Sequence, residues 1–315
     1  MYIPVGISSC LLGHKVRFDG SDKGQKWAKD VLTNHFDFRH LCPEMAAGMP
    51  TPRDTLRLVQ NEDELRMVTT KDQSKDWTDK VSGVVDQHKG SLMNLCGYVL
   101  TAKSPSCGME RVRVYSGGKS NQHVKNGVGL FTRRLSELFP WMPMEEDGRL
   151  NDPVLRENFI MRVFALHDLN QSVLNNPSAD ALVKFHSRYK LMYMAHSQEL
   201  YRELGRQVAN VGNENLDAFL INYRQKFMDT LAIKVHRKRH VNVLMHIMGY
   251  FKKQLSSNQK AELLTLFEQY NQAHIPLMAP LTLINHYLNE YPNKYLTQQV
   301  YLQPYPVELS LRYGM

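Results

Sequence analysis

Three of the four cysteines in this sequence share one local setting. Cys10 lies in ISSCLLG, Cys42 in HLCPEMAAG and Cys107 in SPSCG, so each follows a short apolar run and stands beside turn residues. Cys96 lies inside the apolar stretch NLCGYVL, and we expect it to be a packed thiol. If the other three runs are neighbouring strands of one sheet, their C-terminal loops bring three thiolates together.

Three thiolates with a vacant fourth position suit two kinds of centre. One is a catalytic zinc ion, and the other is an iron–sulfur cubane in which one iron has no protein ligand. The close C-x-x-C or H-x-x-H spacing that is typical of zinc pairs is missing around these cysteines. A third interpretation also fits the spacing, namely three unrelated cysteines in cores or turns.

Polar residues next to two of these cysteines add possible proton-transfer groups. Glu44 stands two positions after Cys42, and a carboxylate in a sheltered pocket can act as a general base or acid. Ser104 and Ser106 place hydroxyl groups close to Cys107. As isolated features these residues also fit ordinary roles, with the glutamate on the surface and the serines capping a turn.

The elements that must position these residues alternate between strands and helices. Strands that run into loops are expected in IPVGISSCLLG, FRHLCPEMAAGMPTPRD and LCGYVLTAKSPSCGM. LRLVQ and LRMVTT are expected to form a hairpin around the acidic turn NEDE. Helices are expected in QKWAKDVLTNHF, in DWTDKVSGVVDQHKGSL and in NGVGLFTRRLSELFP, the last stopped by Pro140. This alternation predicts an α/β domain with functional loops at one end of its strands.

The pattern changes at residues 168–180, where DLNQSVLNNPSAD is polar and contains Asn-Pro. Almost every later segment has helical periodicity, for example HVNVLMHIMGYFKKQL. We therefore predict an α/β domain over residues 1–167, a linker over 168–180 and an all-α domain over 181–315.

Charge and composition limit the class of protein. The chain has 315 residues, 43% of them apolar, and a mean hydropathy of -0.42, values typical of a globular protein. The opening residues have no basic, apolar signal pattern, so we expect a cytoplasmic protein. The net charge is +8; residues 151–315 hold 18 Lys and Arg against 13 Asp and Glu, so a nucleic-acid surface is expected there.

Several long blocks of the sequence resemble known families. ISSCLLG…VRFDG, CPEMAAGMPTPR, AKSPSCG and GRLNDPVLRENF are similar to the signature blocks of the thiouracil desulfidase (TudS) family. KFHSRYKLMYMAHSQELYRELG, NVLMHIMGYFKK, PLTLINHY and YLQPYP resemble the YbgA-type domain of unknown function. The whole chain resembles the fused RudS-type proteins, which remove sulfur from 4-thiouridine in tRNA.

The resemblance implies a site and a cofactor. It assigns a 4Fe–4S cluster with one open iron to Cys10, Cys42 and Cys107, and catalytic roles to Glu44 and Ser104. The activity it implies is a hydrolytic, non-redox desulfidation in which the open iron acts as a Lewis acid on the thiocarbonyl sulfur and the product is uridine.

Further residues are expected to bind substrate or RNA. Asp19, with Arg17 in VRFDG, is a candidate for shaping the same pocket as Ser106, although Asp19-Gly20 also fits a plain turn. KVHRKRH at 234–240 is the candidate phosphate-binding segment of the second domain, through Lys234, Arg237, Lys238 and Arg239.

Two other functions stay open at this point. The chain could desulfurate free thiouracil or thiouridine, with the helical domain serving oligomerisation or a protein partner. It could also be a metal-containing nucleic-acid-binding protein without catalysis. Iron and acid-labile sulfide content distinguishes the last possibility, and substrate size distinguishes the first two.

Overall fold

A computed structural model describes the chain except for residues 1, 26–33, 62–63, 118–121, 310 and 314–315. The chain divides into two compact units, residues 1–155 and 156–315. This division differs from the predicted limits of 1–167 and 181–315. Helix α6 (Pro153–Leu169) continues into a π-helical turn (Asn170–Leu174), so most of the expected linker is helical. The difference arises because α6 buries apolar side chains on several faces and belongs to the core of unit 2.

A parallel sheet in unit 1 carries the strands that the three cysteines follow. Its order is β2 (Phe36–Leu41), β1 (Ile3–Ser8), β5 (Tyr98–Leu100) and β8 (Met144–Glu146), with parallel pairing throughout. β1 is almost fully buried, as an apolar run inside a parallel sheet should be. Gly6 is needed there, because a Cβ atom would lie 2.2 Å from the ring of Tyr98. Since parallel strands end at the same edge, the loops after β2, β1 and β5 meet there.

A second, mixed sheet has the order β4 (Glu64–Thr69), β3 (Leu56–Asn61), β6 (Val112–Ser116) and β7 (His123–Gly127). The predicted hairpin of LRLVQ with LRMVTT is confirmed, because β3 and β4 pair antiparallel from Leu56↔Thr69 to Asn61↔Glu64. β3 and β6 pair parallel, and β6 and β7 pair antiparallel.

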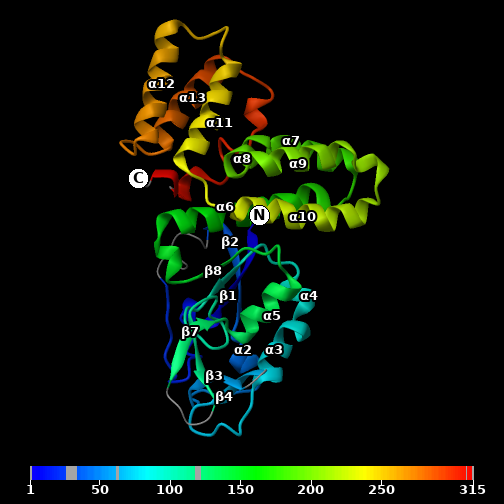
Figure 1. Cartoon of the computed structure of the whole chain (residues 1–315), viewed down its shortest axis with the longest axis vertical. Helices are drawn as coiled ribbons and strands as arrows, with labels where there is room; N and C mark the ends of the chain where they lie inside the picture. Colours follow the sequence, from blue (N-terminus) through cyan, green and yellow to red (C-terminus); the bar gives the residue numbers. More distant parts are fainter. Residues whose placement is uncertain (1, 26–33, 62–63, 118–121, 310, 314–315) are drawn as a thin grey trace. The chain divides into compact units, whose positions relative to one another are not determined.

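Helices of unit 1 lie against its strands (Figure 1). Side chains of strands and helices form one core between them. The helices are α2 (Pro43–Ala46), α3 (Thr78–Gln87), α4 (Lys89–Leu92) and α5 (Leu130–Leu138). α5 is the predicted amphipathic helix before Pro140, and it buries Phe131 and Leu135 against the core. The helix predicted in QKWAKDVLTNHF falls mostly on residues 26–33, which lie outside the described residues, and its last residue, Phe36, begins β2.

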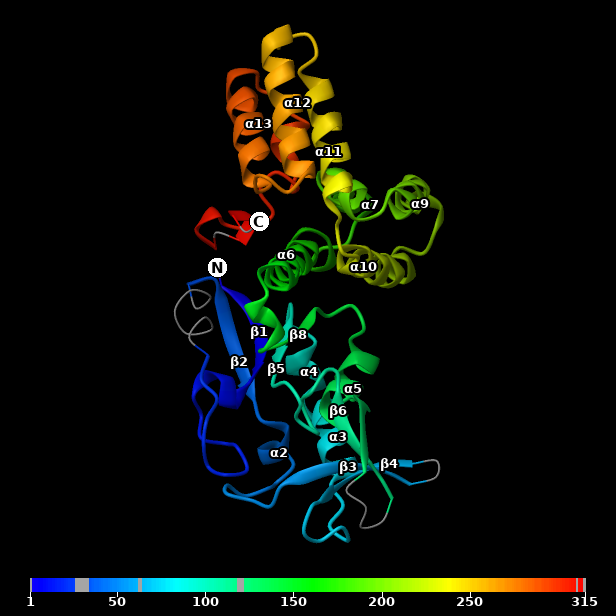
Figure 2. The ribbon, with the colours of Figure 1, turned by 60° about the vertical axis from the view of Figure 1, so that its left-hand side comes forward.

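Unit 2 consists of helices and turns, and its described residues contain no strand, as predicted. Its helices after α6 are α7 (Ala179–Arg188), α8 (Lys190–His196), α9 (Gln198–Ala209), α10 (Leu216–Ala232), α11 (Arg237–Tyr250), α12 (Ser257–Asn271) and α13 (Met278–Glu290). α11, α12 and α13 pack side by side (Figure 2), while α8 contacts α9, α10 and α11. No described helix has the length and apolar content that crossing a membrane requires.

Candidate active site

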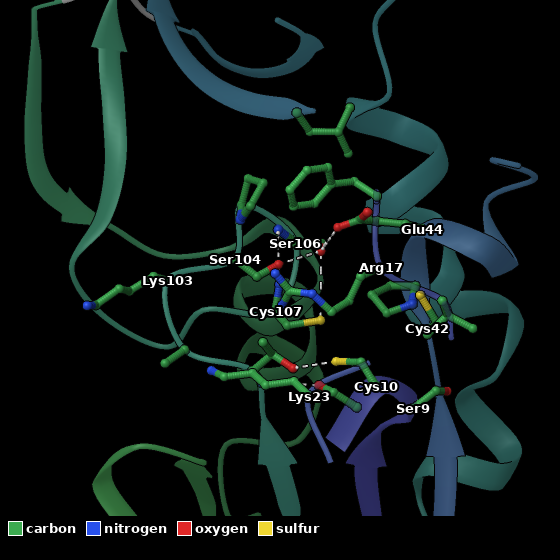
Figure 3. Close-up of a pocket in the computed structure, with 18 of the residues that line it drawn as sticks. Ser9, Cys10, Arg17, Lys23, Cys42, Glu44, Lys103, Ser104, Ser106 and Cys107 are labelled. Carbon is green, nitrogen blue, oxygen red and sulfur yellow. Dashed lines mark hydrogen bonds between the residues drawn. The ribbon is translucent and has the colours of Figure 1, made fainter. Parts of the chain in front are cut away.

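The three predicted thiols line one cavity of unit 1. Cys10 lies in the turn directly after β1, Cys42 directly follows β2, and Cys107 lies in the loop after β5. All three border a cavity of about 400 Å³ (Figure 3). The expectation that their strands lie side by side is confirmed, since β2, β1 and β5 are adjacent. Cys96 lies elsewhere: it is 1% exposed, and its N–H donates to the Pro4 carbonyl at 2.8 Å.

Burial makes these thiols poor anions in the absence of a cation. It raises the pKa of Cys10, although a contact of 3.1 Å with the Thr101 hydroxyl and the nearby charge of Arg17 act in the opposite direction. Burial also raises the pKa of Cys42 and, more strongly, that of Cys107. The charges of Cys42 and Glu44 add to the rise for Cys107. Thiols whose ionisation is disfavoured in this way suit a centre that brings its own positive charge.

The donor set of the cavity consists of three sulfur atoms from three different loops. Thiolates bind both zinc ions and the irons of iron–sulfur clusters. The residues present therefore fit a metal centre of either kind.

Glu44 shares the cavity and is held at both carboxylate oxygens. Arg53 donates from Nε to Oε2 at 2.8 Å, and a terminal nitrogen of the same guanidinium lies 2.5 Å from that oxygen. The Ser106 hydroxyl donates to Oε1 at 2.6 Å. The Arg53 side chain is only 6% exposed, and it also donates to the Val16 carbonyl at 2.9 Å. Glu44 is thus fixed by an ion pair rather than left free on the surface.

Arg53 is a site residue that the sequence analysis overlooked. It lies in the quoted block CPEMAAGMPTPR, nine positions after Glu44. The chemistry of Glu44 could have indicated it. A carboxylate in a sheltered pocket needs a charged hydrogen-bond partner, and arginine supplies several N–H donors.

The two serines of SPSCG form a relay that ends on Glu44. Because the Ser106 proton goes to Glu44, the contact of 2.9 Å between the two hydroxyls is donated by Ser104. Ser104 Oγ accepts in turn from the N–H groups of Ser106 and Cys107, at 3.3 and 3.1 Å. Ser106 is fully buried, so it links Ser104 to Glu44 rather than standing at the cavity mouth. Both predictions, that the serines cap a turn and that they belong to the site, describe part of this arrangement.

The loop that carries Cys107 is anchored by β8. Asp147, 1% exposed, accepts from the Ala102 N–H at 2.9 Å, and Glu146 accepts from the Met109 N–H at 2.8 Å. Asp147 also pairs with Lys23 at 2.8 Å, and Lys23 borders the cavity. These two carboxylates were not singled out in the sequence, because an acidic pair after a short apolar run resembles a surface turn.

Asp19 occupies a turn beside the site. Its carboxylate accepts from the Ser21 N–H at 3.0 Å and from the Ser21 hydroxyl at 2.6 Å, and these bonds lower its pKa. Arg17 and Phe18 border the cavity, whereas the Asp19 side chain is 45% exposed. Asp19 therefore stabilises the turn that presents Arg17, the other role considered for it, and its binding of substrate stays a prediction.

Comparison with known proteins agrees with this site. Residues 5–147 match a family model described as 2-thiouracil desulfurase, and residues 190–306 match DUF1722, a family of unknown function. The uncharacterized protein YbgA of Escherichia coli (strain K12) is 38% identical over 159 residues, which cover 50% of this chain and 94% of that protein. The chain belongs to the YbgA-type proteins and carries a 2-thiouracil desulfurase domain. A solved [4Fe-4S]-dependent thiouracil desulfidase, TudS, is 28% identical, covers 48% of this chain and 94% of its own, and has a TM-score of 0.39.

The cysteine cavity thus lies within the desulfurase domain, and the chain is a desulfidase. The family match covers the strands, loops and carboxylates described above, since it extends from residue 5 to Asp147. The recognised fusion of two families is also confirmed.

The predicted RNA-binding segment of the YbgA-type domain is partly used inside that domain. Arg237 donates to the Tyr270 carbonyl at 3.0 Å and stacks over the Tyr270 ring, with the guanidinium carbon 5.0 Å from its centre. Arg239 donates to the carbonyl of His196. Lys234 and Lys238 are exposed. The two arginines thus hold the start of α11 to neighbouring helices, and RNA binding by this segment stays a prediction.

Proposed function

We propose that this protein removes sulfur from 4-thiouridine in tRNA and leaves uridine and sulfide. We assign the cofactor as a 4Fe–4S cluster bound by Cys10, Cys42 and Cys107, with one iron open. One observation carries the proposal: three thiols from adjacent strand ends share a cavity with a fixed carboxylate. The family description, 2-thiouracil desulfurase, supports the class of chemistry.

The three thiols fit the cluster as ligands, and other residues of the cavity carry out the proton transfer. When bound, the cluster supplies a Lewis-acidic iron for the soft thiocarbonyl sulfur of the substrate. Glu44 accepts a proton from a water molecule whose oxygen attacks C4 of the ring. The C–S bond then breaks, the ring keeps the oxygen as a carbonyl, and the sulfur leaves as sulfide, so no external electron donor is needed.

Arg53 and the serines make this proton transfer efficient. The ion pair with Arg53 holds the carboxylate in one orientation, which lowers the entropy lost on reaching the transition state. When Glu44 becomes protonated, its bond with Ser106 can reverse, and the hydroxyls of Ser106 and Ser104 can pass the proton along the loop. Ser104 thus serves as the relay and substrate-orienting group at the cavity.

A nucleotide substrate agrees with the cations of the cavity. Lys103 borders the cavity and is exposed, and within the described part of the chain it has no ion-pair partner. A phosphate attached to the thiolated nucleoside would supply one. The basic second half of the chain favours RNA over a single nucleotide.

The test compares substrates of different size. Anaerobically purified full-length protein is given 4-thiouridine-containing tRNA, free 4-thiouridine and free 2-thiouracil, and loss of the thiocarbonyl absorbance is followed. Faster turnover of tRNA supports the proposal. Turnover of the free compounds alone would replace it with the second candidate, a small-molecule desulfidase, which the description of the family model favours. If a sample that contains iron and acid-labile sulfide turned over none of the three substrates, the result would indicate a non-catalytic protein.

A further inference from the structure

The YbgA-type domain contains a groove that none of its predicted RNA-binding residues borders. It lies between α7 and α9, which contact each other (Figure 1), and has a volume of about 1080 Å³. Its lining includes cations, a tyrosine, a histidine and a glycine: Lys190, Arg202, Arg206, Tyr201, His186 and Gly205.

The charge of this groove is positive and not neutralised internally. Lys190, Arg202 and Arg206 border it together with a single acidic side chain, Glu199, among its described lining residues. In the part of the chain that the structure describes, these three cations form no ion pair. The neighbouring Glu203 is paired with Lys226 at 2.6 Å, and of the three groove cations only Arg206 has a charge that acts on it. A polyanion is therefore the complementary ligand.

A buried histidine adds an unpartnered polar atom to the groove. His186 is 3% exposed, its Nδ1 lies 3.1 Å from the Tyr223 hydroxyl, and its Nε2 has no hydrogen-bond partner among the described residues. Burial lowers the pKa of His186 to about 4, so the imidazole is neutral at pH 7. An unpaired buried nitrogen of this kind costs free energy unless a ligand completes it.

The neighbouring tyrosines indicate which atom of this histidine carries the proton. Tyr193 and Tyr223 are joined by a contact of 2.6 Å between their hydroxyls. If Tyr193 donates to Tyr223 and Tyr223 donates to Nδ1, the buried chain leaves one group unpaired, the Nε2–H. The opposite direction leaves both the Tyr193 proton and the Nε2 lone pair unpaired. The first direction is favoured, so His186 presents a donor that fits a phosphate or base oxygen.

Gly205 keeps the space in front of this donor open. It lies in the interior of α9. A Cβ atom at this position would meet only Nε2 of His186, at 3.9 Å. Glycine inside a helix is less stable than alanine, and access to the groove explains why this position carries no side chain.

The groove continues toward an aromatic surface. Gln198, Tyr201 and Arg202 border both the groove and an adjoining pocket of about 270 Å³. That pocket is lined by Tyr250 and Tyr295, whose rings stack with centroids 5.3 Å apart at an angle of 24°. Tyr250 is exposed, and Tyr201 and Tyr295 are half-buried. Cations that alternate with accessible aromatic rings are the features that bind unstacked bases and their phosphates.

We infer that this groove binds a single-stranded segment of RNA. Lys190, Arg202 and Arg206 contact phosphates, His186 Nε2–H donates to an oxygen of the RNA, and Tyr201 with the Tyr250–Tyr295 pair stacks on bases. The choice of RNA over another polyanion rests on the proposed function. The positive charge, the unpartnered donor and the aromatic rings of the groove are independent of the proposed function.

The test measures binding of an unmodified, fluorescein-labelled single-stranded oligoribonucleotide to the full chain by anisotropy, at several salt concentrations. Arg202→Ala/Arg206→Ala should weaken binding about tenfold and lower the magnitude of the salt slope by about 1.4, the value for two lost phosphate contacts on a single strand. Gly205→Leu, which fills the space beside Nε2 without meeting the backbone, should weaken binding with little change in that slope.

Matched variants decide whether the effect belongs to the groove. Lys252→Ala/Lys253→Ala removes the same charge from exposed positions elsewhere in the domain and should change affinity less than about twofold. Equal losses from both pairs, or a larger loss from Lys234→Ala/Lys238→Ala, would overturn the groove as the RNA site. Unmodified RNA contains no sulfur, so this binding assay does not depend on catalysis. Groove-dependent binding by a protein that fails to desulfurate 4-thiouridine-containing tRNA would refute the proposed function and leave this inference standing.

Discussion

The cavity of the desulfurase domain and the groove of the YbgA-type domain differ in how their polar groups are satisfied. In the cavity, both oxygens of Glu44 are bonded within the protein, and the loop of Cys107 is anchored by Asp147 and Glu146. In the groove, Nε2 of His186 is unpaired. The first arrangement is preorganised for a reaction at fixed positions, whereas the second is complete only when a ligand is bound.

Removal of a cavity thiol should have the largest effect. Cys10→Ala, Cys42→Ala and Cys107→Ala should each abolish the brown colour, the iron content and turnover, because the cofactor loses a ligand. Cys96→Ala is the control, since Cys96 is equally buried but lies outside the cavity lining, and its iron content should persist. Retained iron and activity in any of the three variants would refute the assignment of that cysteine.

Removal of the proposed base should have the next largest effect. Glu44→Gln keeps the size of the side chain and should lower kcat by about 100- to 10,000-fold, the usual contribution of general base catalysis. Iron content and the visible spectrum should be unchanged, which would separate loss of the base from loss of the cofactor. Unchanged kcat would remove Glu44 from the mechanism.

Arg53 tests whether the fixed geometry of the cavity matters in itself. Arg53→Lys keeps the charge but loses the bidentate contact, and kcat should fall about tenfold through misorientation of Glu44, with KM almost unchanged. Arg53→Gln should lower kcat further. Arg66→Lys is a matched control in the same unit, because Arg66 pairs with Asp76 away from the cavity. Equal effects of the two lysine variants would indicate a general loss of stability.

The smallest expected effect is a pH dependence of stability that differs between the two units. Burial lowers the pKa of His186 and His196 to about 4, so the unfolded chain binds more protons than the folded one below pH 6.5. The free energy of unfolding of unit 2 should therefore fall between pH 6.5 and 4, by at most about 1.4 kcal/mol per pH unit and histidine.

Amide hydrogen exchange of both units across this pH range would measure the difference. Among the described residues, histidines with a lowered pKa occur in unit 2, so unit 1 should lose less stability. His196→Asn should reduce the pH dependence of unit 2. A parallel loss of stability in both units would contradict this account.

The sequence was most informative where short loops follow strands. The α/β class, the β3–β4 hairpin and the meeting of Cys10, Cys42 and Cys107 could be predicted because a parallel sheet places the ends of its strands together. Arg53 could not be predicted, because its position depends on a loop that folds back from α2 onto Glu44. Asp147 was missed for a similar reason, since its partner Ala102 belongs to a different strand end.

Helix surfaces were harder to predict. A basic run such as KVHRKRH does not indicate which cations face outward, and Arg237 and Arg239 bond to backbone carbonyls of neighbouring segments. Periodicity alone also leaves open whether Tyr189 and Tyr193 belong to the core or to a binding surface; both are buried. The compact units divide before the predicted linker, because α6 and the turn after it are helical although their polar residues resemble a linker.

The anchoring of the Cys107 loop by β8 has a consequence for how the protein is made. Cys10 is among the first residues to be synthesised, yet the loop opposite it is fixed by Glu146 and Asp147, near the end of the same unit. β5 also pairs with β8, so the sheet edge that gathers the thiols is complete only when residue 147 is available. Contacts between distant parts of a chain form late in folding. The cofactor of the proposed function would then be inserted after synthesis of the whole desulfurase domain, and we expect a nascent chain cut short before β8 to hold its cysteines as separate thiols.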